Sequence, residues 1–467
     1  MRHTPWLAFA IDRSAKTPVF EQICAAVRDR TISGELTEGT RLPPTRAFAV
    51  ELGVSRSTVV TAYEQLVAEG YLSSLTGSGY TICATGQVEL PAHRTPPGPE
   101  QEGEQPRKPV PFEASQPDMR LFPHRQWAKA VSRVCRTNPQ SMLVSGALFG
   151  NYKLRQAIAA HVAEWRGIQA SAHQIAITAG STDALEICMR ALTAKGDTIG
   201  LEDPGYMPAR SFAQAHGLSQ IRLEIDGNGA RLPPDGTKPQ LVMLTPSQQY
   251  PLGGAMSPGR RLEFIRWAKA NGTWIVEDDY DSEFRYAGRP IPAMAGFDRL
   301  NRTIYIGSFS KIFSNSLRLG YVILPETLLE PFRTTLMRFG IKASYLPQQA
   351  LSEFMASGEF YRHLRRVRRI YAERRKYLID RLTADFSDVG TFQDHQAGMQ
   401  IVLHLNDRWT DTVIAQRAAE KSVEVQALSE MASDKCACNG LVLGFCGYQQ
   451  EEMAAGLAVL RSCFDQA

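Results

Sequence analysis

The sequence lacks several features that would place a protein in a class at once. Its eight cysteines include no Cys-x-x-Cys pair, which argues against a disulfide framework and a usual zinc site. We expect reduced thiols, with Cys436-x-Cys438 an incidental loop pair and metal or redox use as the alternative. No stretch approaches the roughly 20 apolar residues of a membrane span, and no apolar run follows a basic start. A cytoplasmic protein without a metal site is expected.

The sequence also has little excess of one sign of charge, since the net charge is only +4 over 467 residues. Any binding of nucleic acid must therefore come from local placement of Arg and Lys, not from bulk charge. The apolar fraction of 43% and the charged fraction of 21% are ordinary for a globular protein. A chain of this length usually holds two or three domains. Residues 84–111, rich in Pro, Glu and Gln, predict an extended linker between them.

Three helices are predicted before residue 71. Apolar residues recur at helical spacing over residues 18–34, which end at a glycine suited to a helix C-terminus. A second helix is expected to begin at the N-cap Thr45 and to stop at Gly53, which can adopt a left-handed turn. Ser55 is expected to cap a third helix over residues 56–70. Two helices joined by a tight Gly-Val-Ser turn predict a helix-turn-helix.

Two short strands are predicted after these helices, over residues 71–73 and 79–82, with a wing turn at 75–78. In such modules the first turn of the second helix of the pair faces base edges, while arginines and backbone amides contact phosphates. The candidate DNA-contacting residues are Arg46, Arg56, Ser57 and Thr58. The alternative is a small helical cap that carries surface arginines and binds no DNA.

The string RLPPTRAFAVELGVSRSTVVTAYEQLVAEGYL, followed by GSGY, resembles the winged helix-turn-helix of GntR-family transcription regulators. This resemblance implies a DNA-binding domain over residues 1–83. It carries phosphate and base contacts over to Arg46 and Arg56 and places the wing glycine at Gly79. Acidic and basic side chains nearly balance in this segment, so one module should bind weakly and two would be needed.

Beyond residue 112 the pattern changes to alternating strands and helices. Helical stretches such as 183–196 and 259–272 separate short β-rich apolar runs. These runs cover residues 175–178, 198–201, 240–244, 273–276 and 303–306. The alternation predicts an α/β domain with a mostly parallel sheet, whose ligand lies beyond the carboxyl ends of the strands.

Each predicted strand end carries one part of a possible cofactor site. Residues 178–182 open a helix with amides and hydroxyls that can receive an anion. A carboxylate in the stretch 277–280 can pair with a protonated pyridine nitrogen. Lys311 supplies an amine between hydroxyls, Arg318 offers a fork of donors to a phosphate, and Tyr206 can stack on a ring.

Each of these features also has a plain structural interpretation. A strand-end lysine is usually structural, an aspartate can cap a helix, glycine and serine suit any turn, and a tyrosine can pack in a core. Only the order and spacing of the whole set favour a site.

The strings ITAGSTDAL, EDPGYMPAR, IVEDDYDSEFRYAGRP and GSFSKIFSNSLRLGY resemble the fold-type I aminotransferase domain of the MocR subfamily of GntR regulators. The resemblance covers residues 18–83 and 112 to about 450. It implies an aminotransferase-like domain over residues 112–467 with a smaller C-terminal subdomain, which binds pyridoxal 5'-phosphate (PLP) and forms a homodimer.

The resemblance also implies a role for each candidate residue. Lys311 would form the PLP aldimine, Asp278 would meet the pyridine nitrogen and Tyr280 the ring hydroxyl, and Tyr206 would stack on the ring. Asp279 competes with Asp278, because strand alternation turns only one of the two inward, and the family pattern favours Asp278. The phosphate cup would consist of Gly180, Ser181, Thr182, Ser308, Ser310 and Arg318.

Three features depart from a working aminotransferase. The stretch 440–445 lacks the arginine that usually clamps a substrate carboxylate, and small residues near Ser145 replace a tyrosine that such enzymes lend across the dimer. Residues 249–253 stand where an Asn-Pro-x-Gly turn is usual. Without the clamp, the orientation needed for proton transfer is lost. Cofactor binding is therefore expected, while ordinary α-amino-acid transamination is in doubt.

The cationic run 362–376 suggests nucleic-acid binding, but its apolar residues keep a helical stripe. We favour a solvated helix face. For the whole chain we expect a dimeric transcription regulator that binds an operator and senses PLP or an amino compound. The alternatives are an active aminotransferase with an accessory DNA-binding domain, and a DNA-binding protein whose second domain only dimerises.

Overall fold

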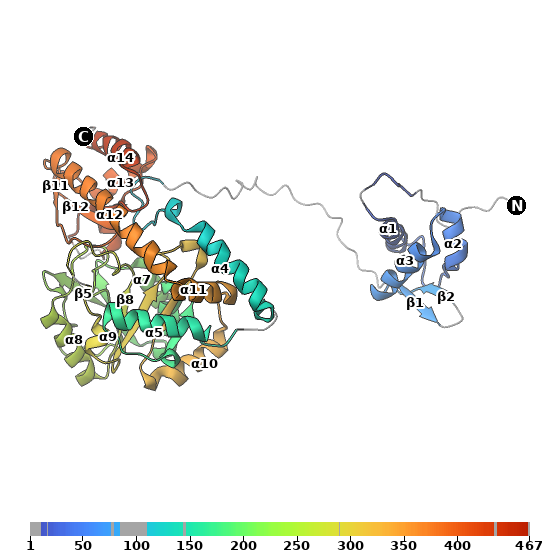
Figure 1. Ribbon diagram of the computed structural model, residues 1–467, viewed down its shortest axis with the longest axis horizontal. Coiled ribbons are helices and arrows are strands. Elements are labelled where there is room, and N and C mark those ends of the chain that lie inside the picture. The colour runs from blue at the N-terminus through green and yellow to red at the C-terminus, as the bar shows by residue number, and fades with distance from the viewer. Residues whose placement is uncertain are drawn as a thin grey trace. The chain divides into compact units, whose positions relative to one another are not determined.

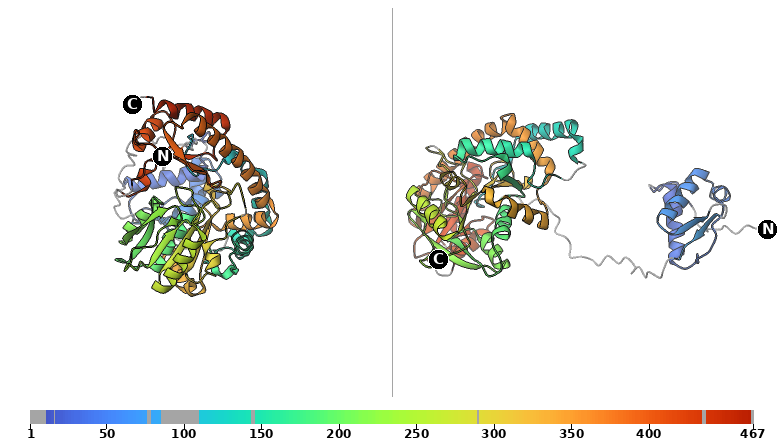
Figure 2. Two further views of the ribbon diagram at one scale, coloured as in Figure 1. Left: turned by 90° about the vertical axis from the view of Figure 1, so that its left-hand side faces the viewer. Right: turned by 90° about the horizontal axis from the view of Figure 1, so that it is seen from below.

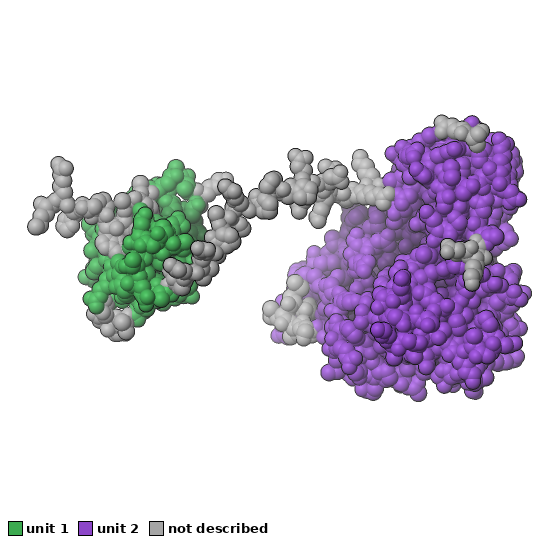
Figure 3. Space-filling view, turned by 180° about the vertical axis from the view of Figure 1, so that it is seen from behind, with its two compact units in different colours: residues 1–106 green, residues 107–467 purple. Residues whose placement is uncertain are grey.

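The computed structural model describes residues 11–15, 17–75, 79–84, 110–142, 146–288, 290–433 and 437–465. The chain divides into two compact units, residues 1–106 and 107–467 (Figure 3). Some predicted features lie outside the described residues. They are positions 85–109 of the linker, positions 76–78 of the wing turn, Ser145 and Cys436.

The described part of unit 1 is a winged helix-turn-helix, as predicted (Figure 1). Its elements are α1 (Val19–Ile32), α2 (Thr45–Leu52), α3 (Arg56–Ala68), β1 (Leu72–Leu75) and β2 (Gly79–Ile82). The two strands pair antiparallel, with Leu72 opposite Ile82. Leu75, expected in the wing turn, is instead the last residue of β1. A separate apolar core that includes Ile23, Phe48 and Tyr63 holds the helices against the strands.

The turn between α2 and α3 shows how local sequence sets this unit. Gly53 takes a left-handed conformation with φ of 63° at the end of α2, and the Ser55 hydroxyl accepts the Thr58 amide at 3.1 Å. The expectation that Thr45 is an N-cap is wrong. Thr45 is the first helical residue, and the capping position belongs to Pro44, which has no side-chain oxygen to offer an amide.

Unit 2 contains an eight-stranded sheet within its described residues. Its strands are β3 (Ile175–Thr178), β4 (Thr198–Asp203), β5 (Ser219–Asp226), β6 (Gly229–Ala230), β7 (Leu241–Leu244), β8 (Trp274–Asp279), β9 (Thr303–Ser308) and β10 (Gly320–Ile323). The order is β3-β10-β9-β8-β7-β4-β5-β6. The pairs from β5 to β9 are parallel, and β10 runs antiparallel to both of its neighbours. The predicted mostly parallel sheet is confirmed.

Helices cover both faces of this sheet, so its strands are apolar on both sides. On β7, Leu241 and Met243 belong to a core formed with α6 and α7, while Val242 and Leu244 pack into a core shared with α8. The helices are α4 (His124–Thr137), α5 (Tyr152–Arg166), α6 (Ser181–Leu192), α7 (Met207–Ala215), α8 (Pro258–Asn271), α9 (Met294–Phe297), α10 (Leu329–Phe339), α11 (Tyr345–Ala356) and α12 (Glu359–Asp385). Single 3-10 turns cover Met119–Leu121, Pro139–Met142, Ala172–Gln174, Asn315–Leu317, Glu326–Leu328 and Ser429–Met431.

A smaller C-terminal subdomain follows α12, as expected. Its strands β11 (Gly390–Phe392), β12 (Gln400–Leu405), β13 (Gln426–Ala427) and β14 (Gly440–Gly444) form an antiparallel sheet in the order β11-β12-β14-β13. Helices α13 (Asp411–Glu420) and α14 (Gln450–Ser462) complete it. Figure 1 and the left view of Figure 2 show these C-terminal elements gathered at one end of unit 2.

The cationic run at 362–376 lies within α12 and turns its apolar stripe to the core. Leu364, Val367 and Tyr371 are buried, and Arg374 is buried in an ion pair with Asp118 at 2.7 Å. These contacts favour the interpretation of the run as a helix face over nucleic-acid binding, because at least one of its arginines is used in an ion pair within the fold.

The cysteines depart from expectation at one position. Cys438 is disulfide-bonded, whereas Cys24, Cys83, Cys135, Cys188, Cys446 and Cys463 are free thiols. The expectation of reduced thiols is therefore wrong for Cys438. Among the described residues, no group of His, Cys, Asp or Glu is arranged to hold a metal ion, and no helix there has both the length and the apolar character that crossing a membrane requires.

Candidate functional site

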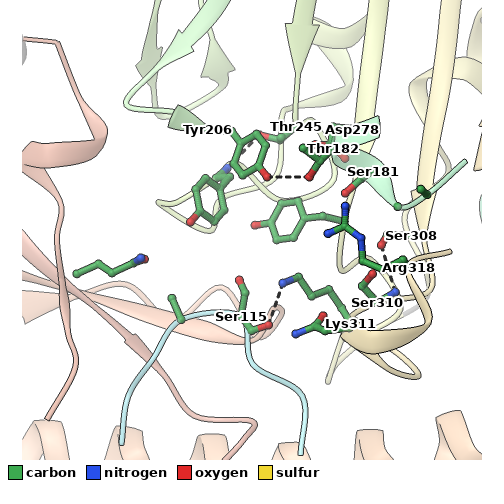
Figure 4. Close-up of a pocket in the computed structure, with 17 residues that line it drawn as sticks. Ser115, Ser181, Thr182, Tyr206, Thr245, Asp278, Ser308, Ser310, Lys311 and Arg318 are labelled. Atoms are coloured by element: carbon green, nitrogen blue, oxygen red, sulfur yellow. Dashed lines mark hydrogen bonds between the residues drawn. The ribbon is translucent and has the colours of Figure 1, made fainter. Parts of the chain in front are cut away.

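A cavity of about 290 Å³ opens at the carboxyl ends of β3, β7, β8 and β9 (Figure 4). Parallel strands bring their carboxyl ends to one edge, which is where ligands of such sheets bind. All ten residues predicted to hold a cofactor line this cavity, although they come from different segments of the chain. They are Gly180, Ser181, Thr182, Tyr206, Asp278, Tyr280, Ser308, Ser310, Lys311 and Arg318.

The pleat of β8 separates its two aspartates. Asp278 lines the cavity, whereas Asp279 pairs with the buried Arg166 at 2.7 Å and accepts a hydrogen bond from Tyr305. Successive residues of a strand point to opposite faces, so only one of the pair can reach the ligand. The geometry selects Asp278.

One carboxylate oxygen of Asp278 lacks a partner among the residues that the structure describes. Its Oδ1 atom is buried without a hydrogen bond to any described residue. Burial, reinforced by the carboxylates of Asp279 and Glu202, raises the pKa of Asp278 to about 7, against the opposing effect of Lys311. A buried acceptor without a donor is costly, so this position suits a ligand that brings a proton or a positive charge.

Lys311 lies in the turn after β9 and points into the same cavity. Its Nζ atom donates to the Ser115 carbonyl oxygen at 3.0 Å (Figure 4). Burial lowers the pKa of Lys311, although Asp281 and Asp278 oppose this effect. A lowered pKa leaves more of the amine uncharged and able to react with a carbonyl carbon.

A further part of the lining offers donors that suit an anion. The first turn of α6 presents backbone amides there, preceded by Gly180 with φ of 93°. Ser308 and Ser310 lie at the end of β9, linked by a hydrogen bond from the Ser310 amide to the Ser308 hydroxyl at 3.2 Å. A methyl group on Gly320 would lie only 2.8 Å from the Gly180 carbonyl carbon, so β10 packs directly behind this cradle.

Three tyrosines form the aromatic part of the lining. Tyr250 contacts Tyr206 edge-on at 5.8 Å between ring centres and Tyr280 at 5.5 Å. The hydroxyls of Tyr206 and Thr182 lie 3.3 Å apart. The buried Tyr280 hydroxyl has no hydrogen-bond partner among the described residues, so it can still serve a ligand.

Sequence patterns gave no individual cofactor role to the remaining lining residues, which are Ala114, Ser115, Ala179, Thr245, Tyr250, Asn315 and Gln426, although Ala179 lies within the stretch 178–182 that was predicted to receive an anion. Thr245 directly follows β7, and its place at a strand end was a signal that could have found it. Ser115 and Gln426 belong to segments without a motif. Only the tertiary structure brings them to the cavity.

In unit 1, the predicted DNA-contacting residues lie on the surface. Arg46 on α2, Arg56 and Ser57 on α3, and Gly79 on β2 are exposed. In the described part of the unit neither arginine makes an ion pair. The hydroxyls of Ser57 and Thr58 lie 2.7 and 2.8 Å from the Ser55 hydroxyl, so they complete the capping of α3.

Comparison with known proteins identifies both units. Residues 20–82 match the gntR family of bacterial regulatory proteins, and residues 110–437 match the aminotransferase class I and II family. The chain is 35% identical to the "Probable rhizopine catabolism regulatory protein MocR" of Rhizobium meliloti, with 97% of this chain and 95% of the relative covered. The chain belongs to the MocR subfamily of GntR-family transcription regulators.

Another MocR-type relative is the "HTH-type pyridoxine biosynthesis transcriptional regulator PdxR" of Corynebacterium glutamicum. It is 33% identical, with 97% of each chain covered. Among solved structures, an α-aminoadipate aminotransferase from Thermus thermophilus superimposes with a TM-score of 0.68 at 25% identity, over 76% of this chain and 92% of that one. This regulator is thus a DNA-binding protein with an aminotransferase fold.

Two of the three sequence features that depart from a working aminotransferase can be located in the structure. The stretch without arginine forms β14, where Val442 pairs with Gln426 of β13. Within the described residues, Lys311 and Arg318 are the only cations that line the cavity. The Gln249 amide donates to the Pro204 carbonyl at 2.9 Å and holds the turn that presents Tyr250.

Proposed function

We propose that this regulator binds PLP in the cavity around Lys311 and that this site controls how the winged helix binds its operator. One observation carries the proposal. Ten residues from separate segments meet around one cavity, and Asp278 and Tyr280 keep buried polar atoms there without a partner in the described chain. Such atoms are rare in native proteins unless a ligand satisfies them.

The residues present fit PLP. Asp278 would pair with the protonated ring nitrogen, Tyr280 would donate to the ring hydroxyl, and Tyr206 would lie against the ring. Ser308, Ser310, Arg318 and the amides of Gly180, Ser181 and Thr182 would hold the phosphate. When bound, PLP supplies an aldehyde that condenses with primary amines and releases water. Lys311 is the amine that the protein places there.

The effector is proposed to be PLP itself or an amino compound. The names of two relatives support this range, since one is called a pyridoxine biosynthesis regulator and the other a rhizopine catabolism regulator. The solved aminotransferase of the same fold is described in complex with N-(5'-phosphopyridoxyl)-L-leucine. We therefore propose that the regulated genes serve vitamin B6 or amino-compound metabolism.

Arg46, Arg56, Ser57, Thr58 and Gly79 are proposed to contact the operator. We further propose that the aminotransferase-like domain forms a head-to-tail homodimer in the cytoplasm, with domains at 1–83 and 112–467 and a linker at 84–111. Two modules would then read two half-sites. A ligand changes DNA binding only if it has different affinities for two arrangements of these modules.

The second candidate is an active aminotransferase with an accessory DNA-binding domain. The Lys311, Asp278 and Tyr280 set favours it, because these groups also support transamination. The absence of arginine from β14 counts against it, since a substrate carboxylate would not find its usual clamp there. Steady turnover with an amino donor and a 2-oxo acid would establish this alternative.

The test compares binding of wild type and Lys311→Ala to the DNA upstream of the protein's own gene, with and without PLP at fixed salt. We expect PLP to shift the affinity or the footprint of wild type and to leave Lys311→Ala unchanged. Lys269→Ala, which removes an exposed lysine of α8, is the matched control and should respond like wild type. If wild type binds no PLP by absorbance, or binds DNA identically with and without it, PLP control is wrong.

A further inference from the structure

The cavity lining divides into two parts of different chemistry. The residues proposed to hold PLP include every charged group in the lining. The remaining residues are all uncharged, and they are Ala114, Ser115, Ala179, Thr245, Tyr250, Asn315 and Gln426. Any compound that occupies the cavity together with PLP meets this second part, which is here called the uncharged part.

Several polar side chains of the uncharged part are already engaged with the protein. The Ser115 hydroxyl donates to Gln400 at 3.0 Å. The Asn315 amide donates to Gln116 at 3.1 Å. Thr245 donates its hydroxyl to the buried Glu202 and accepts the Tyr250 amide at 3.0 Å. These hydrogen bonds fix how the three side chains face the cavity, and none of the three is among the buried polar atoms that lack a partner in the described chain.

Gln426 differs from these groups. It lies on β13, the edge strand of the small sheet, and its Oε1 atom is buried without a hydrogen bond to any described residue. An unsatisfied buried carbonyl destabilises the fold, whereas a neutral hydrogen bond to it recovers most of that cost. The amide therefore suits a ligand that carries an uncharged hydrogen-bond donor.

Nearby arginines do not make up for the missing clamp. Arg210 and Arg222 both pair with Asp203 at the end of β4, at 2.6 and 2.8 Å. A carboxylate moved into the uncharged part would lose its water and gain no cation, which is strongly unfavourable. Glutamine offers neither the charge nor the two-pronged donor geometry of arginine.

We propose that the effector is a primary amine without a carboxylate, such as an amino alcohol, and that Gln426 accepts the hydrogen bond of its hydroxyl group. The amine end of the effector lies at Lys311, and its hydroxyl end reaches β13. Gln426 is thus the residue that decides between amino alcohols and amino acids. This inference rests on the proposed binding of PLP.

The test uses 3-amino-1-propanol and β-alanine, which have the same length and differ in carrying a hydroxyl or a carboxylate. Each is titrated into the full-length, PLP-loaded protein, with cofactor absorbance and affinity for operator DNA as two readouts. For wild type we expect the half-saturating concentration of the amino alcohol to be at least about 10-fold lower, because the carboxylate is not solvated in the cavity.

Variants at position 426 separate hydrogen bonding from shape. Gln426→Leu should weaken the response to the amino alcohol by about 3- to 10-fold, the loss of one neutral hydrogen bond. Gln426→Glu keeps the shape and the acceptor, so it should retain that response and weaken the response to β-alanine further. Gln426→Arg should reverse the preference. Gln416→Arg, which adds the same charge on the exposed face of α13, is the matched control and should keep the wild-type preference.

Equal or stronger response of wild type to β-alanine would overturn the inference, as would response to neither amine or a Gln426→Arg variant with an unchanged preference. These outcomes leave cofactor absorbance intact, so they are distinct from a failure of the proposed function. A wild-type protein without cofactor absorbance, or with the same absorbance in Lys311→Ala, would overturn the proposed function and this inference together.

Discussion

The two units present their recognition residues in opposite ways. In unit 1, Arg46 and Arg56 are exposed to water and make no ion pair with the residues that the structure describes there. In unit 2, Asp278 is 6% exposed, and the buried Tyr280 hydroxyl has no partner among the described residues. The same chain therefore has one recognition surface that folding leaves solvated and one that folding must desolvate.

This difference determines where the binding energy comes from. An exposed arginine costs folding nothing, and its contact with DNA gains mainly from the release of counterions, which depends on salt. A buried carboxylate without a partner destabilises the empty fold, and the ligand recovers that cost on binding. Mutations should therefore have different effects in the two units. In unit 1 they should lower only the affinity for DNA, and in unit 2 they should change the stability of the fold.

The largest expected effect is on DNA affinity. Arg56→Ala should reduce binding to the operator by about 2–6 kcal/mol if each of two modules loses a contact worth about 1–3 kcal/mol. Anisotropy of labelled DNA at fixed salt measures this loss. The absorbance of bound PLP and the thermal unfolding of unit 2 should not change.

Glu64→Ala is the matched control, because Glu64 is an exposed acid on the same helix. It removes a charge of opposite sign and should not weaken binding. Equal losses in both variants would mean that the helix is disturbed and would remove Arg56 from the proposed contacts.

The next effect is on stability and its pH dependence in the protein without PLP. Burial raises the pKa of Asp278 from 3.8 to about 7, so the folded state holds a proton that the unfolded state releases between these values. The free energy of unfolding must then fall as pH rises from about 4 to about 7, by up to about 4 kcal/mol at 1.36 kcal/mol for each pH unit. Asp278→Asn stays neutral, so its melting temperature should exceed that of wild type at pH 8 and match it at pH 5.

Asp279→Asn is the control for this prediction, because it breaks the buried ion pair with Arg166. Loss of one partner of a buried pair costs about 3–5 kcal/mol, so this neighbouring substitution should lower the melting temperature at pH 8. If both variants shift the melting temperature at pH 8 in the same direction, the prediction that the two faces of β8 respond differently is wrong.

The smallest effect is on the local stability of unit 1. Ser55→Ala removes the acceptor of the Thr58 amide and should cost about 1 kcal/mol. Hydrogen exchange of the α3 amides in the full-length protein should speed up accordingly, with no change in unit 2. Ser73→Ala, at an exposed position of β1, should leave the exchange of α3 unchanged.

Local chemistry made much of this molecule predictable from its sequence. Gly53 and Ser55 marked the turn between α2 and α3 because a left-handed glycine and a capping hydroxyl act over a few residues. Among the strands that escaped prediction, β5 and β10 show the opposite case. β5 alternates polar and apolar residues and pairs with β4, while β10 is short and pairs with β9 and with the remote β3, so both depend on hydrogen bonds to other strands.

The sequence alone determined which residues could carry the chemistry of the site, because each of them follows a strand or opens a helix, where short-range patterns are readable. Strand alternation left Asp279 as a competitor of Asp278, and only the family resemblance favoured Asp278, since the choice depends on the face of β8 that the helices cover. The sequence did not reveal Ser115 or Gln426, which reach the cavity only when segments about 100 to 200 residues away from Lys311 fold against it. Such contacts depend on the packing of the two subdomains, and no local pattern encodes them.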